Sequence, residues 1–196
     1  MRTRGLVAGF LSVALLITLG GCGGAVKQAK PQRMGTEVFA EVRNQQPPSE
    51  GTVDLTIKAS IKTPPEGYYL YGSRIPSEKE GFRFELNIDG QEILWKLEGK
   101  EETAPHYDEK GRRIPEGGRG IRYVLDRRIR LQPGLHHVMF GLPLEDFYTE
   151  FKVTLKQGEP HTLEFQPVYA MGRRGVRTFH HGIKRYEVFL DGTQIK

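Results

Sequence analysis

The chain of 196 residues contains one cysteine and one tryptophan, and its one long hydrophobic run lies near the start. A single thiol cannot form an internal disulfide, so the folded part depends on its hydrophobic core. The sequence also lacks a phosphate-binding loop, a dinucleotide fingerprint, a His-Glu-x-x-His zinc motif, an EF-hand loop and a nucleophile elbow. We therefore expect no enzymatic activity, no cofactor and no metal site.

The cysteine, Cys22, closes the hydrophobic run. Two arginines precede an apolar stretch over residues 6–19, which is shorter than a typical membrane-spanning helix, and Gly20 and Gly21 follow it. A positive start, a short apolar segment and small residues before a cleavage site are typical of an export signal. The segment Leu19-Gly20-Gly21-Cys22 resembles the lipobox of bacterial lipoproteins.

That resemblance implies that Cys22 is lipidated and becomes the mature N-terminus. Acyl chains such as palmitate contribute about 0.8 kcal/mol per buried CH2, so two or three chains anchor a protein firmly. Glycine at position 23, where enterobacterial sorting reads aspartate as a retention signal, favours the outer membrane, with the periplasmic or surface face left open. A secretory signal with a chance cysteine and an uncleaved short membrane helix are the alternatives.

The predicted organisation is a signal peptide over residues 1–21, a tether over 22–35 and a single domain over 36–196. Residues 23–35 are rich in glycine and polar residues and show no periodicity, as expected of a flexible tether. Removing residues 1–21 takes away two arginines and no acidic residue, so 29 basic residues become 27 against 24 acidic ones. The mature protein is therefore only mildly basic.

The domain shows a hydrophobic period of two, which is typical of β-strands. Residues 36–43 are predicted as a first strand with Val38, Ala40 and Val42 on one face. From residue 52 on, alternate residues from Val53 to Ile61 are apolar, and Pro64-Pro65 ends this strand.

A β-hairpin is predicted around Asp89-Gly90, a preferred pair for a type I′ turn. A two-residue loop places Leu86 opposite Ile93, Phe84 opposite Trp95 and Phe82 opposite Leu97, all on one face. We therefore expect Trp95 in the core rather than stacked on a ligand.

The rest of the chain gives further strands. Residues 121–131 carry apolar side chains at every odd position except Arg127. Gln132-Pro133-Gly134 is predicted to turn this strand into its partner, with Leu135 opposite Leu131. Residues 151–155 and 163–165 are predicted as two more strands of a meander, and Asp191-Gly192 as the turn of a terminal hairpin. The fold class expected is all-β, an antiparallel sandwich of immunoglobulin-like or transthyretin-like type with few or no helices.

One stretch supports this fold class through a resemblance. Residues 129–138 (IRLQPGLHHV), 151–159 (FKVTLKQGE) and 163–165 (LEF) resemble the pattern of PEGA-type and carboxypeptidase-regulatory-like β-sandwich modules. The resemblance covers about forty residues and implies a non-catalytic interaction or spacer domain of the bacterial envelope. It carries no functional residues to this chain.

Charge is unevenly distributed along the domain. Residues 78–109 hold ten acidic and four basic residues, whereas residues 111–130 hold seven arginines and two acidic residues. Guanidinium groups suit phosphate and carboxylate groups because they donate hydrogen bonds in a fork. The candidate residues for binding an anion or a partner are Arg112, Arg113, Arg119, Arg122, Arg128 and Arg130. Alternatively, the acidic and basic segments neutralise each other across adjacent strands.

The polar segment 103–120 is predicted to be a long loop that forms the recognition surface together with these arginines. The expected function is that of a lipid-anchored envelope protein, an interaction, assembly or structural module that contacts a membrane, an envelope protein or an anionic envelope polymer, but not nucleic acid. The alternative is a glycan-binding or glycan-acting protein that uses Tyr69 and Tyr71 and carboxylates of this loop. The paired histidines 136–137 and 180–181 do not specify a metal site if they lie on strands, because neighbours on a strand point to opposite faces. A loop at His180-His181-Gly182 is the alternative in which that pair would bind a metal.

Overall fold

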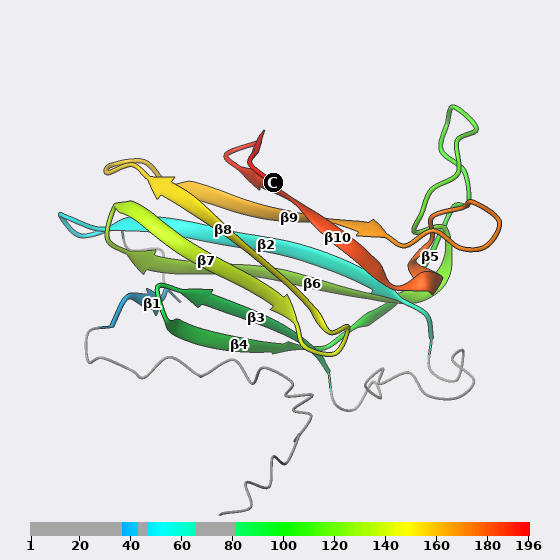
Figure 1. Cartoon of the computed structure of the whole chain (residues 1–196), viewed down its shortest axis with the longest axis horizontal. Coiled ribbons are helices and arrows are strands. Elements are labelled where there is room, and N and C mark those ends of the chain that lie inside the picture. The colour runs from blue at the N-terminus through cyan, green and yellow to red at the C-terminus, as the bar shows by residue number, and fades with distance from the viewer. Residues whose placement is uncertain (1–36, 43–46, 66–80) are drawn as a thin grey trace, which may run out of the picture. The chain divides into compact units, whose positions relative to one another are not determined.

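The computed structural model describes residues 37–42, 47–65 and 81–196, and the structural statements below concern these residues. They form two β-sheets packed face to face, so the fold is an all-β sandwich (Figure 1). Sheet A has the strand order β1-β6-β2-β9-β10-β11, with β5 also paired to β6, and sheet B has the order β4-β3-β7-β8. The predicted fold class is confirmed at the level of the β-sandwich.

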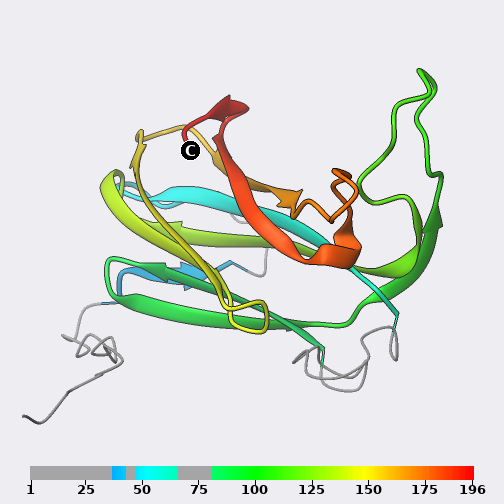
Figure 2. The ribbon, with the colours of Figure 1, turned by 45° about the vertical axis from the view of Figure 1, so that its right-hand side comes forward.

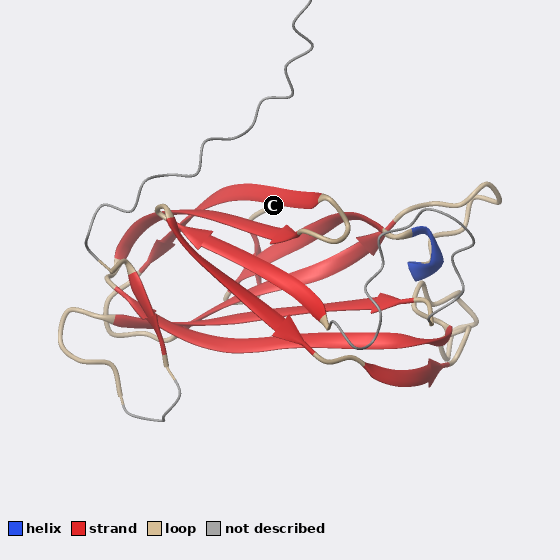
Figure 3. Cartoon of the chain, turned by 90° about the horizontal axis from the view of Figure 1, so that it is seen from below, coloured by secondary structure: helices blue, strands red, loops and turns tan. Residues whose placement is uncertain are grey.

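The strands have these bounds. Sheet A contains β1 (Phe39–Glu41), β2 (Val53–Thr63), β5 (Lys100–Ala104), β6 (Gly118–Leu131), β9 (His161–Tyr169), β10 (Ile183–Leu190) and β11 (Thr193–Gln194). Sheet B contains β3 (Phe82–Ile88), β4 (Gln91–Leu97), β7 (Gly134–Leu142) and β8 (Phe147–Leu155). Helical structure in the described residues is confined to a three-residue 3-10 turn, η2 (Phe179–His181), blue in Figure 3.

None of the helical structure in the described part of the chain has the length and hydrophobicity of a membrane span.

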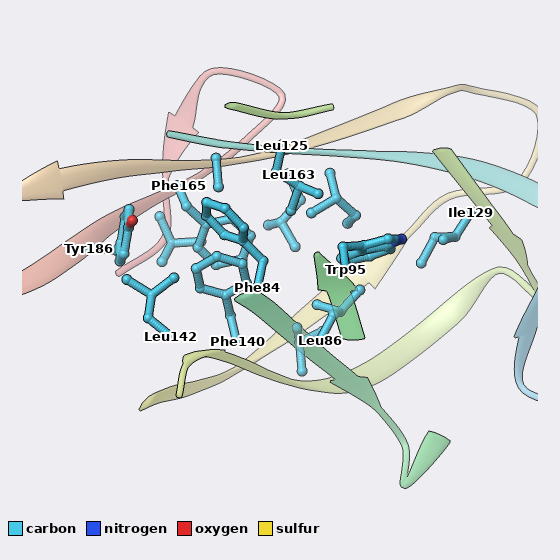
Figure 4. Close-up of a cluster of buried hydrophobic side chains, with 14 of the residues drawn as sticks. Phe84, Leu86, Trp95, Leu125, Ile129, Phe140, Leu142, Leu163, Phe165 and Tyr186 are labelled. Carbon is cyan, nitrogen blue, oxygen red and sulfur yellow. The ribbon is translucent and has the colours of Figure 1, made fainter. Parts of the chain in front are cut away.

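The core lies between the two sheets and is rich in aromatic rings (Figure 4). Phe140 of sheet B stacks on Phe165 of sheet A with ring centroids 3.8 Å apart, and Tyr186 meets Phe140 edge-on at 5.5 Å. These side chains are at most 2 % exposed. Burial of each large apolar side chain contributes about 1.5–3 kcal/mol, and this layer holds the sheets together without a disulfide.

The β3–β4 hairpin forms in the predicted register. Phe84 pairs with Trp95, Leu86 with Ile93 and Phe82 with Leu97, and Trp95 is 6 % exposed in the core. Asp89 adopts a positive φ of 49°, as a type I′ turn requires. The odd-numbered inner faces of β2 and β6 and the terminal β10–β11 hairpin are confirmed as well. On the other face of β2, Asp54 and Lys62 were expected in water but are buried, at 6 % and 1 % exposure.

The predicted partner of β6 is wrong. β6 pairs with β2 along its length and with β1 and β5 at its two ends, whereas β7 crosses to sheet B and pairs with β3 and β8. Leu135 is consequently 65 % exposed instead of packing opposite Leu131, and the even-numbered residues of β7, such as Val138 and Phe140, face the core. The chain therefore passes from sheet A to sheet B at the turn after Leu131.

Two other predictions need correction. β8 pairs with β7, but β9 returns to sheet A and runs parallel to β2, so β8 and β9 are not neighbours in a meander. In β1 the buried residue is Phe39, at 3 % exposure, while Ala40 is exposed. The side chain that β1 buries most deeply is therefore not on the predicted apolar face of Val38, Ala40 and Val42, although Val38 also packs partly against the core. The large aromatic ring of Phe39 gains more from burial than the methyl group of Ala40.

Two tyrosines bind backbone groups of β2 beyond the point where its pairing with β9 ends. The parallel ladder ends at Ala59 and Phe165, and beyond it the Tyr186 hydroxyl donates to the Ser60 carbonyl (3.1 Å) while the Lys62 N–H donates to the Tyr169 hydroxyl (2.9 Å). The side chains thereby satisfy backbone groups of β2 that a neighbouring strand would otherwise bind.

Two Asp-Gly turns are fixed by buried histidines in the same way. At the β3–β4 turn, Asp89 meets the His136 Nδ1 atom at 2.7 Å, and at the β10–β11 turn Asp191 meets the His161 Nδ1 atom at 2.6 Å. The second oxygen of each carboxylate accepts the backbone N–H of the residue after the histidine, at 2.8 Å in both cases. Each contact ties a hairpin turn to the first residues of the neighbouring strand.

Candidate functional site

Two loops that are distant in the sequence lie side by side at one end of the sandwich (Figure 2). The first, residues 105–117, joins β5 to β6, and the second, residues 170–182, joins β9 to β10 and contains η2. The Phe179 N–H donates to the Pro115 carbonyl at 3.1 Å and links them. We call the exposed part of residues 105–117 and 170–182 the two-loop surface.

The first loop is shorter than predicted. Residues 103–104 belong to β5 and residues 118–120 to β6, so 105–117 remains between the strands. The loop also contains a backbone bridge between Tyr107 and Arg113 and a turn in which Asp108 accepts the N–H groups of Lys110 and Arg112. It is therefore an ordered hairpin-like segment.

An ion network around the buried side chain of Lys62 fixes the base of this loop. Lys62 is 1 % exposed, and its ammonium donates to the carbonyls of Glu116 (2.8 Å) and Gly118 (2.7 Å) and lies 3.2 Å from the Glu102 carboxylate. Arg122 bridges the Glu102 and Glu116 carboxylates at 2.8 and 2.6 Å. Two cations and two anions thus compensate each other where burial of an unpaired charge would be costly.

The network extends to Tyr169, whose hydroxyl donates to Glu116 at 2.6 Å. Burial, followed by the Glu116 charge, raises the pKa of Tyr169 well above its usual value, so the hydroxyl stays a donor. Hydrogen bonding to Arg122 lowers the pKa of Glu102, and the same carboxylates raise the pKa of Arg122. All of these groups have partners inside the protein, which indicates a positioning role.

Gly120 allows β6 and β2 to approach closely beside the side chain of Lys62. A Cβ atom at this position would lie 2.7 Å from the Lys62 Cε atom and 2.7 Å from the Thr63 carbonyl oxygen. Any side chain would therefore push β6 away from β2 at the base of the loop.

The two-loop surface carries an excess of positive charge. Residues 105–117 and 170–182 together contain six lysines and arginines and three acidic residues, with His106, His180 and His181 in addition. Two of the acids are already bound, Glu116 in the network and Asp108 to Arg112 at 2.7 Å. The exposed cations that have no ion pair within the described residues are Lys110, Arg113, Arg173 and Arg174.

The surroundings of His180 at this end of the molecule lower its pKa. Burial lowers its pKa, and the positive charges of His181, Lys62, Arg113 and His106 lower it further. Groups from β2 and from both loops thus act on one imidazole. The same field favours an anion near the surface.

Four of the six predicted arginines form ion pairs within the protein. Arg119 binds Glu101 and Arg122 binds Glu102 across the β5–β6 pair, Arg130 holds Asp54 through two bonds of 2.7 and 3.1 Å, and Arg112 binds Asp108. Neutralisation across adjacent strands therefore accounts for much of the charge segregation. Arg113 and Arg128 are exposed, and no ion pair joins either to an acid in the described part of the chain.

The other predicted sites lie elsewhere. Cys22, Tyr69 and Tyr71 fall outside the described residues. Among the described residues no group of three or more His, Cys, Asp or Glu side chains is placed to hold a metal ion. His136 and His161 serve the hairpin turns, and His137 is exposed on the outer face of sheet B.

A shallow groove of about 190 Å³ crosses the outer face of sheet A where β2 and β9 separate. Lys58, Asp126 and Glu164 contribute charges of both signs to its lining. Asp126 pairs in register with Lys58, which in turn pairs with Glu164, so the charges alternate across the sheet. This pattern does not select a ligand of one charge.

The sequence placed Arg112 and Arg113 on the predicted recognition surface and offered Arg173, Arg174 and Arg177 as additions to the arginine-rich face. It did not predict that residues 105–117 and 170–182 meet. A useful signal was the second glycine- and arginine-rich segment, residues 172–177 (GRRGVR), which resembles residues 111–120 in composition. Lys62 gave no signal of its role, because its alternation with Ile61 matched that of a solvent-facing lysine.

A comparison of the chain with known proteins finds no matching family model, no matching curated protein and no matching solved structure.

Proposed function

We propose that the chain is a lipid-anchored protein of the bacterial cell envelope that acts without catalysis, by binding an anionic envelope polymer through the two-loop surface. The observation that carries the proposal is the meeting of two loops about sixty residues apart in sequence, which gathers exposed cations such as Arg113, Arg173 and Arg174 at one end of the domain. Phosphate or carboxylate groups are the ligands such a surface favours.

The position of the surface supports this proposal. Phe39, near the start of the described domain, pairs with Leu131 at one end of β6, and the first loop joins β6 at Gly118, the other end. A strand of 14 residues spans about 45 Å. The point where the described domain begins, residue 37, therefore lies at the opposite end of β6 from the two-loop surface.

The stiffness of the surface is further support. The Lys62, Glu102, Glu116 and Arg122 network and the hydrogen bond from Phe179 to Pro115 hold both loops in place before any ligand arrives. Binding by a preorganised surface costs less conformational entropy than binding by a loose loop.

The lipid anchor is tested by mass spectrometry of the protein purified from membranes of a bacterial host. We expect the N-terminal peptide to begin at Cys22 and to carry a diacylglyceryl group, and we expect Cys22→Ala to abolish incorporation of a labelled fatty acid. An unmodified peptide, or a mature chain that begins elsewhere, would contradict the anchor.

The ligand class is tested by binding of the purified full protein to lipopolysaccharide, to peptidoglycan and to a neutral glycan at low and high salt. We expect binding to one of the anionic polymers that weakens as salt rises, because salt screens exposed charges. Salt-insensitive binding to the neutral glycan would instead favour a glycan-binding protein.

A further inference from the structure

Strand β8 (Phe147–Leu155) leaves one edge of sheet B open. It is the last strand in the order β4-β3-β7-β8, and no strand in the described part of the chain pairs with its outer side. The strand is nine residues long, contains no proline or glycine, and pairs with β7 without a bulge. Natural edge strands are usually short, kinked or covered, because an open ladder of N–H and C=O groups recruits another strand.

The hydrogen bonds identify the groups that face outward. His137 of β7 directs its N–H and its carbonyl toward Asp89, on the β3 side. Neighbouring residues of a strand point their backbone groups to opposite sides, so even-numbered residues of β7 bind β8. Their register partners in β8 are odd-numbered, as in the pair Val138 and Phe151. The outward-facing residues of β8 are therefore Tyr148, Glu150, Lys152 and Thr154.

A second observation agrees with this parity. The Lys196 ammonium donates to the Glu150 carbonyl at 2.6 Å, as expected of a carbonyl that does not face β7. The contact shows that the Glu150 carbonyl is accessible to a donor at the open edge.

We propose that this edge pairs with the β8 strand of a second copy of the chain, antiparallel, about a twofold axis at Phe151. In this register Phe151 lies opposite the partner's Phe151, and Glu150 lies opposite the partner's Lys152. The four outward-facing residues then meet outward-facing residues of the partner subunit, as hydrogen-bonded antiparallel pairs require. The two copies of sheet B become one continuous sheet.

Charge selects this register over its neighbours. A shift of two residues in one direction places Glu150 opposite the partner's Glu150, and a shift in the other places Lys152 opposite the partner's Lys152. Like charges directly opposite destabilise an antiparallel pair, whereas opposite charges stabilise it. A shift of one residue brings each inner-face side chain to the outer face and mismatches the backbone groups.

The apolar side chains at the edge fit the same arrangement. Phe147 and Phe151 point inward but remain partly exposed, and the second β8 strand would cover the exposed part of each ring. Pairing replaces the contact of Lys196 with Glu150 by backbone hydrogen bonds. The inference rests on sheet B alone and does not depend on the lipid anchor or the two-loop surface.

Charge reversal tests the proposal in the detergent-solubilised full chain, with molecular mass measured by analytical ultracentrifugation. We expect a dimer for the parent protein, a dissociation constant raised about tenfold or more for Glu150→Lys and for Lys152→Glu, and recovery in the double variant that exchanges both charges. Both side chains are exposed, so the fold should tolerate these changes. A parent protein that stays monomeric, or single variants that dimerise as well as the parent, would overturn the proposal.

Disulfide trapping tests the position of the axis. In a Cys22→Ser background, which removes the chain's one cysteine, Phe151→Cys should form a covalent dimer on mild oxidation because the two positions face each other. Thr154→Cys is the matched control, since in this register the two copies of residue 154 lie about 20 Å apart. Equal trapping at both positions, or trapping at 154 alone, would contradict the register.

Discussion

Lys62 shows how one residue can determine the shape of a loop. Its ammonium lies inside the protein and binds two carbonyls and a carboxylate at the point where the first loop leaves β5 and enters β6. Removal of the ammonium leaves the Glu116 and Gly118 carbonyls without this donor, while the Glu102 carboxylate keeps Arg122 as its partner. A buried acceptor left without a donor costs about 1–3 kcal/mol.

We therefore expect Lys62→Met to lower the free energy of unfolding by about 3 kcal/mol, measured by urea denaturation. Lys58→Met is the matched control on the same strand, since Lys58 is exposed, and it should change stability by less than about 0.5 kcal/mol. Equal effects of the two substitutions would show that the network does not stabilise the fold.

His180 links stability to pH. Its pKa in the folded protein lies below the ordinary value of 6.5, so the unfolded chain binds the proton more readily. The stability that this histidine contributes is fully present above pH 6.5 and is lost as pH falls through the lowered pKa.

We expect the free energy of unfolding to decrease more between about pH 8 and about pH 5 in the parent protein than in His180→Gln. Urea denaturation at the two pH values measures the difference. A variant with an unchanged pH dependence would show that the pKa of His180 is not lowered in the folded protein.

At the scale of elements, the two Asp-Gly turns show what local sequence determines. Alternation and a preferred turn pair were enough to predict the β3–β4 hairpin and its register, because both strands and the turn lie within sixteen residues. The contact of Asp89 with His136 spans 47 residues and depends on β7 joining sheet B. A Pro-Gly turn signals a reversal but does not say which sheet receives the next strand, so the β6–β7 pairing was predicted wrongly.

The Asp191 contact should stabilise the last hairpin. We expect Asp191→Ala to cost about 2 kcal/mol of unfolding free energy, since it removes two hydrogen bonds and places alanine at a positive φ. Asp191→Asn should cost less, because asparagine tolerates this conformation and still accepts the Thr162 N–H. Thermal unfolding of both variants tests this order, and a cost for asparagine equal to that for alanine would contradict it.

At the scale of the whole molecule, composition indicated an arginine-rich surface but not which arginines are available. Arg122 and Arg130 alternate with core residues on β6, as solvent-facing side chains do, yet each meets a carboxylate that only the pairing of β6 with β5 or β2 brings near. Arg173 and Arg174 join the surface because β9 and β10 return to the same end as β5 and β6. The topology of the strands, rather than the local sequence, therefore determines which cations are available to bind a ligand.

In the proposed function, the two-loop surface binds an anionic envelope polymer. The most direct test is the affinity of the full protein for the anionic polymer it binds, compared between Arg113→Ser/Arg173→Ser/Arg174→Ser and the control Arg128→Ser, an exposed arginine on the outer face of sheet A. We expect the triple variant to lose most of its salt-sensitive affinity and the control to bind as the parent does. Unchanged binding by the triple variant, or an equal loss in the control, would contradict it.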